Sequence, residues 1–106
     1  MAEYAALRGL VNAVVRDEKA PDLSMRQIGV LVAVAENAGK PLSVKPLAEL
    51  MGLQKSAVTR ALDRLEHFAL ASRRKHPMDA RQIEVVVTKA GTDALKALTK
   101  ALGKAA

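Results

Sequence analysis

Apolar residues recur with helical spacing in the first part of the chain, at Leu7, Leu10, Val11 and Val14. A stripe with intervals of three and four positions predicts an amphipathic helix, here of roughly residues 3–18. We expect this helix to end before Pro21, because proline has no amide hydrogen and cannot continue an interior helical turn.

A second helix is predicted over residues 25–37. Ser24 and Gln27 have the spacing of a capping box, in which the serine hydroxyl accepts a hydrogen bond from a first-turn amide while the glutamine reaches back. An apolar stripe with helical spacing follows them, and Gly39 supplies a C-terminal stop.

Two further helices are predicted on either side of a tight turn at Gly52. Ser43 can cap the first of them. Their expected buried residues are, in order, Leu47, Ala48, Leu50 and Met51, then Val58, Ala61, Leu62 and Leu65. Two helices that meet across a tight turn containing glycine are typical of a helix-turn-helix.

Beyond Phe68 the helical period gives way to strand-like segments at residues 70–74 and 83–88, with turn-forming residues between them. In the second segment we expect one face to carry Ile83, Val85 and Val87, and the other to carry Glu84 and Thr88. A hairpin directly after a helix-turn-helix is a wing. Thr88 is then expected to cap a last helix.

The predicted fold class is therefore α+β and mostly α. It is a winged helix-turn-helix with a two-stranded wing, flanked by N-terminal and C-terminal helices. We expect residues 1–106 to form a single domain, since a chain of this length has room for one modest core.

Composition narrows the function classes. The chain has no cysteine, which excludes a disulfide framework, a thiolate zinc site and a thiol nucleophile. Only His67 and His76 offer imidazoles, and neither has a second ligand at metal-binding spacing, so we expect no metal, no cofactor and no enzymatic activity. No apolar run could span a membrane and no signal peptide is evident, so we expect a cytoplasmic, nucleoid-associated protein without a membrane partner.

The net charge of +6 is concentrated in one part of the chain. Between Lys55 and Arg81 there are seven basic and three acidic residues, so that seven minus three, or four, of the six net charges fall there. On charge alone, a solvated basic face and a binding site for a polyanion both stay open.

The spacing of these charges favours DNA. Opposite its apolar stripe, the second helix of the helix-turn-helix presents Lys55, Ser56, Thr59, Arg60, Asp63 and Arg64. A major groove of about 12 Å admits one helix whose guanidinium and hydroxyl groups reach base edges and phosphates. An ordinary amphipathic helix is the alternative interpretation.

The predicted wing carries Arg73, Arg74 and Lys75 before its turn and Arg81 after it, so a hairpin is expected to gather them at one end. Such an end fits a minor groove of about 6 Å, where arginine senses negative potential. Asp79 stands two residues before Arg81 and is placed to orient its guanidinium. A hairpin that is merely soluble is the alternative.

Taken in order, these motifs resemble the MarR-type winged-helix regulators over about two-thirds of the chain. The resemblance rests on residues 23–27, 47–48, 55–66, 79–81 and 88–91. It implies that Ser56, Thr59 and Arg60 read the major groove, and that Arg81 enters the minor groove with Asp79 as its orienting partner.

The chain departs from the family pattern at three places. Gln54 occupies the usual capping position before the recognition helix, which removes a hydrogen bond worth about 1 kcal/mol. Ala69 replaces the usual glycine after that helix; it costs about 1–2 kcal/mol if the left-handed conformation is kept, and otherwise the turn differs. The sequence also ends soon after Leu102, where typical members continue into a further long helix.

Family members pair through their terminal helices, so the resemblance implies a homodimer formed by segments of about residues 1–18 and 89–103. The expected contact residues are Leu7, Leu10, Val11, Val14, Leu95, Leu98 and Leu102. We expect no small-molecule effector, because the short C-terminus leaves little wall for a pocket and only Tyr4 and Phe68 offer aromatic surface.

The sequence thus predicts a transcriptional regulator, a repressor that binds specific double-stranded DNA. Its expected DNA-binding residues are Lys55, Ser56, Thr59, Arg60, Arg64, Arg73, Arg74, Lys75 and Arg81. Two alternatives stay open: a non-specific architectural DNA-binding protein, and a winged-helix module that binds other proteins.

Overall fold

The computed structural model of the chain describes residues 2–19 and 21–105. The elements follow in the order η1 (Ala2–Tyr4), α1 (Ala5–Arg16), α2 (Met25–Glu36), α3 (Val44–Met51), α4 (Lys55–His67), β1 (Ala71–Lys75), β2 (Ile83–Val87) and α5 (Lys89–Ala105). The predicted mostly helical α+β architecture is confirmed. The first expected dimer segment begins at residue 1, which lies outside the described residues.

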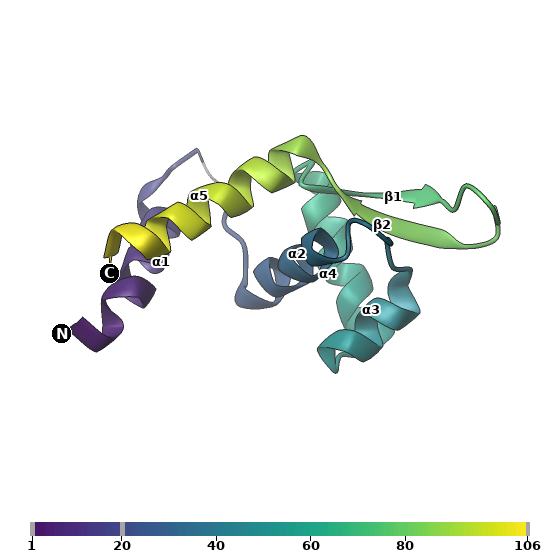
Figure 1. The fold of residues 1–106 in the computed structure, drawn as a ribbon, viewed down its shortest axis with the longest axis horizontal. Helices are drawn as coiled ribbons and strands as arrows, with labels where there is room; N and C mark the ends of the chain where they lie inside the picture. The colour runs from purple at the N-terminus through teal and green to yellow at the C-terminus, as the bar shows by residue number, and fades with distance from the viewer. Residues whose placement is uncertain (1, 20, 106) are drawn as a thin grey trace.

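The molecule has two parts, visible in Figure 1. Helices α2, α3 and α4 pack together with the β1–β2 hairpin around one core, whose fully buried side chains include Leu31, Leu47, Leu62 and Leu65. Helix α1 lies along α5 and contributes no buried residue of its own. The molecule is therefore elongated, measuring 49 × 26 × 23 Å, with an α1–α5 arm at one end and the wing at the other.

Helix α2 begins with the predicted capping box. The Gln27 amide donates to the Ser24 hydroxyl oxygen at 3.1 Å, and the Ser24 amide donates to the Gln27 side-chain oxygen at 2.9 Å. Two amides at the helix start that would otherwise lack a partner are thereby hydrogen-bonded. This local pattern explains why the start of α2 could be predicted from the sequence.

Helices α3 and α4 form the predicted helix-turn-helix. Gly52 ends α3 in the left-handed conformation with φ of 66°, and its amide donates back to the last turn. The prediction that Leu50 is buried is wrong, because its side chain is 60% exposed. The buried face of this short helix is centred on Leu47 and Ala48, and Leu50 lies about 110° away from that centre around the axis.

Ala69 keeps the left-handed conformation that glycine usually supplies, with φ of 58°. Its amide donates to the Glu66 carbonyl at 2.9 Å, and the Leu70 amide donates to the Leu65 carbonyl at 2.8 Å. These two bonds make the Schellman motif that closes a helix. Of the two alternatives posed by the sequence, the strained turn is the one observed.

The wing is an antiparallel pair in which Arg73 faces Val85 and Arg74 faces Glu84. Burial in β2 does not follow the predicted division of faces: Glu84 is 4% exposed, whereas Ile83, on the apolar face, is 39% exposed. Glu84 tolerates burial because Arg74, its partner across the strands, places Nε 2.6 Å from the carboxylate.

The start of α5 docks against the end of α4. The Thr88 hydroxyl accepts from the Gly91 amide at 3.0 Å, as predicted for a cap, and donates to the Ala69 carbonyl at 2.6 Å. A β-carbon at Gly91 would lie 2.0 Å from the Leu70 carbonyl oxygen. Only glycine permits this approach, which sets where the α1–α5 arm leaves the core.

Candidate nucleic-acid interface

Helix α4 presents one buried and one exposed face. Its buried residues are Val58, Ala61, Leu62 and Leu65, as predicted. Thr59 is half-buried, and the exposed face carries Lys55, Ser56, Arg60, Asp63 and Arg64. Gln54 makes no side-chain capping bond, so the departure seen in the sequence is retained in the structure. This face is therefore polar and cationic, and Asp63 is the one carboxylate among the residues named on it.

Arg73 does not lie at the end of the wing. It turns back onto α4, where its Nη2 is 2.6 Å from Asp63 Oδ1 and its Nε bonds to Glu66, and its side chain is 28% exposed. The hydrogen bond to Asp63 is the largest cause that raises the pKa of Arg73 above its ordinary value; burial opposes it, and the hydrogen bond to Glu66 adds to the rise. Arg73 thus neutralises two carboxylates beside the exposed face of α4.

The other basic residues of the wing differ in their exposure and in their acidic partners. Arg74 is engaged by the buried Glu84, although its own side chain is 55% exposed. Lys75 and Arg81 are exposed near the turn. Of the four expected cations, Lys75 and Arg81 therefore lie near the turn, whereas Arg73 and Arg74 are held farther along the wing by Asp63, Glu66 and Glu84.

Arg81 is held at its base and projects into solvent. Its Nε lies 3.3 Å from Asp79 Oδ1, the same oxygen accepts from the Arg81 amide at 3.0 Å, and the side chain is 92% exposed. Asp79 is thus positioned to limit the orientations of this guanidinium, at a small energetic gain for so exposed a pair.

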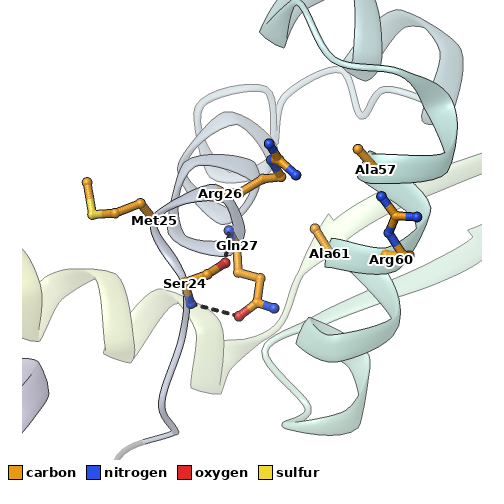
Figure 2. Close-up of a pocket in the computed structure, with 7 residues that line it drawn as sticks. All are labelled: Ser24, Met25, Arg26, Gln27, Ala57, Arg60 and Ala61. Carbon is orange, nitrogen blue, oxygen red and sulfur yellow. Dashed lines mark hydrogen bonds between the residues drawn. The ribbon is translucent and has the colours of Figure 1, made fainter.

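Two hollows border α4, and each is lined by a basic residue that was not predicted from the sequence as a DNA-binding residue. One, of about 520 Å³, lies between the start of α2 and α4, and Figure 2 shows Arg26 and Arg60 reaching it from the two helices. The other, of about 320 Å³, lies where α3, α4 and the wing meet, and it brings together Lys45, Lys55 and Arg81. Both missed residues follow a serine N-cap, a local signal that marks a helix start and not a ligand.

The expected dimer residues fall on two sides of the α1–α5 arm. Leu7 and Val11 are about half exposed, and Leu102 is 38% exposed. The other members of the set are half-buried: Leu10, Val14, Leu95 and Leu98. The stripes therefore pack α1 on α5 and still leave apolar surface facing outward.

A further hollow of about 370 Å³ lies between α1, α5 and the segment before α2, lined by apolar side chains including Val14, Leu23 and Leu98, with Asp17 and Asp93 among the others. The reason given for expecting no small-molecule effector, that little wall remains, is therefore wrong. The absence of an effector stays a prediction.

Within residues 2–19 and 21–105, no three metal-ligating side chains come close enough to hold an ion. In the same part of the chain, no helix combines the length and the apolar character needed to cross a bilayer.

Comparison with known proteins finds one matching family model and several solved structures with a similar fold. The family model of the MarR family matches residues 22–82, more than half of the 106 residues. No curated protein matches the sequence. Among solved structures, a mutant of MepR from S. aureus bound to an oligodeoxyribonucleotide has a TM-score of 0.83 and 17% identity, covering 96% of this chain and 71% of that one.

Two further solved structures have a similar fold and a higher sequence identity to this chain. RV1404 from Mycobacterium tuberculosis has a TM-score of 0.79 and 27% identity, covering 97% of this chain and 67% of that one. The transcriptional regulator BldR from Sulfolobus solfataricus has a TM-score of 0.69 and 26% identity, covering 96% and 70%. The chain therefore belongs to the MarR family and has the winged-helix fold of its transcriptional regulators.

Proposed function

We propose that this protein is a transcriptional repressor that binds specific double-stranded DNA as a homodimer. The observation that carries the proposal is the exposed face of α4, where Lys55, Arg60 and Arg64 pair with no carboxylate of the described residues. Cations without acidic partners are available to a polyanion, and an α-helix of 10–12 Å diameter fits a major groove of about 12 Å.

In this proposal α4 reads bases and the wing reads groove shape. Ser56, Thr59 and Arg60 would meet base edges in the major groove, where all four base pairs are distinguishable. Arg81, projecting from the wing on its Asp79 support, would enter the adjacent minor groove, which reports mainly width and A·T content. The MepR structure bound to an oligodeoxyribonucleotide supports DNA as the partner of this fold.

Arg73 and Arg74 take a different part from the one first expected. Both are engaged by carboxylates, so we assign Arg73 to holding the wing on α4 and Arg74 to holding β1 on β2. Lys75 and Arg64 remain candidates for phosphate contacts, because both are exposed.

Dimerisation is proposed through the α1–α5 arm. Helix α1 has no buried residue, and exposed apolar residues such as Leu7, Val11 and Leu102 are the surface that a second copy would cover. A two-fold dimer presents two α4 helices to two half-sites, so the proposal predicts a DNA site with two-fold symmetry.

The test is to select bound duplexes from a random pool with the purified 106-residue chain. We expect enrichment of a palindromic site bound at least a thousandfold more tightly than random duplex, in line with about 10³ as the lower range for specific regulators. Binding without enrichment would instead support the non-specific architectural alternative. A failure to bind any duplex at low salt would overturn the proposal in favour of a protein-interaction module.

A further inference from the structure

The two hollows beside α4 place cations from other elements next to the recognition helix. Arg26 reaches the first from α2, and Lys45 reaches the second from α3. Both side chains are exposed, and no carboxylate of the described residues pairs with either of them. Each cation is therefore free to bind an anion.

The hollows open on opposite flanks of α4. Ala57 and Ala61 border the first and Lys55 borders the second. At 100° per residue, Lys55 and Ala57 lie about 160° apart around the helix axis. The exposed face with Ser56 and Asp63 lies between these flanks, so any groove that receives this face meets one hollow on each side.

A helix in the major groove has one sugar–phosphate backbone on each side of it. We propose, resting on the function proposed above, that the two hollows bind phosphates of the two strands that border the major groove. Arg26 is the cation on one strand and Lys45 the cation on the other. The recognition helix is thereby centred by a pair of contacts that lie outside both it and the wing.

The chemistry of the hollows fits phosphate. In Figure 2, the α4 side of the first hollow carries the small side chains of Ala57 and Ala61, which leave room between Arg26 and Arg60. In the second, the Ser43 hydroxyl makes no capping bond and adds a donor near Lys45. Basic groups and hydroxyls without base-edge geometry position a protein on DNA and carry no sequence information directly.

The experiment measures operator and random-duplex affinity against salt for Arg26→Gln and Lys45→Gln. Lys100→Gln is the matched control, because it removes the same charge from an exposed residue in the second half of α5. Each lost phosphate contact lowers the slope of log affinity against log salt by about 0.9, equivalent to about 3.5-fold in affinity between about 50 and 200 mM salt. Because a dimer covers two half-sites, we expect twice that slope change for each variant.

We expect both variants to weaken operator and random duplex alike, within about threefold in their ratio, because phosphates carry no sequence information. Lys100→Gln should keep the wild-type slope. Ethylation of single phosphates should then show one strand position per half-site that matters to wild type and no longer matters to Arg26→Gln. For Lys45→Gln the corresponding position should lie on the opposite strand.

The outcomes separate this inference from the proposed function. If wild type binds DNA and both glutamine variants keep its slope, the hollows bind no phosphate and the inference fails while the function stands. If either variant lowers discrimination tenfold or more, that residue reads bases and the assignment is equally wrong. If wild type binds no duplex, both proposals fail together.

Discussion

Replacing Ala69 with glycine should stabilise the protein, which is the opposite of the usual effect of introducing glycine. Ala69 holds φ of 58° in the Schellman motif after α4, a conformation that costs an L-residue about 1–2 kcal/mol. Glycine removes that cost but increases the entropy of the unfolded chain, which opposes it by about 0.4–1 kcal/mol. Because the residue is exposed, little packing is lost with its methyl group.

The net gain in free energy of unfolding is therefore about 0.8 kcal/mol, which corresponds to a rise of about 3–6 °C in Tm for a domain of this size. The assay is thermal and urea unfolding at one fixed protein concentration, because dimerisation makes apparent stability depend on concentration. The control is Ala97→Gly in α5, at an exposed residue that borders the hollow between α1 and α5, where helix propensity predicts a loss of about 1 kcal/mol. If both variants lose stability equally, residue 69 is not left-handed in the folded protein and the reasoning is refuted.

Three other predictions follow from packing, charge and assembly. Gly91→Ala should cost at least about 3 kcal/mol in unfolding experiments, since its methyl group would lie 2.0 Å from a backbone oxygen, whereas Gly103→Ala, with nothing within 4 Å, should not destabilise. Arg73→Met should weaken DNA binding by exposing two carboxylates to phosphates, and Asp63→Asn with Glu66→Gln in the same chain should restore it; an absence of rescue would point to direct phosphate contact by the arginine. Light scattering after size exclusion should give twice the chain mass of 11.3 kDa, and a monomer at tens of micromolar would contradict the dimer.

The elements that were predictable from sequence are those defined by local signals. The start of α2 follows from a capping box within four residues, and the buried stripe of α4 from a repeat of one helical period. The wing was predictable because apolar alternation and turn residues are adjacent in the chain. Such signals involve residues that are close in the sequence, so they can be recognised without knowledge of the tertiary structure.

What the sequence did not reveal depends on contacts between distant elements. Arg73 was expected at the end of the wing. Its partners Asp63 and Glu66 belong to α4, and only the packing of the wing on that helix brings the three residues together. The burial of Glu84 likewise requires a cross-strand arginine. Residues Arg26 and Lys45 have no distinguishing spacing of their own, and their proximity to α4 appears only in three dimensions.

The measurement that tests the central claim most directly is a salt titration of wild type, Arg60→Ala and Arg81→Ala on selected and random duplexes. A direct base contact is worth about 1–3 kcal/mol, so Arg60→Ala should lose both affinity and discrimination. Arg81→Ala should weaken both duplexes more evenly and flatten the salt dependence by about 0.9 for each half-site. If Arg60→Ala keeps the wild-type ratio of selected to random affinity, α4 does not read bases, and the account of this protein as a sequence-specific regulator is wrong.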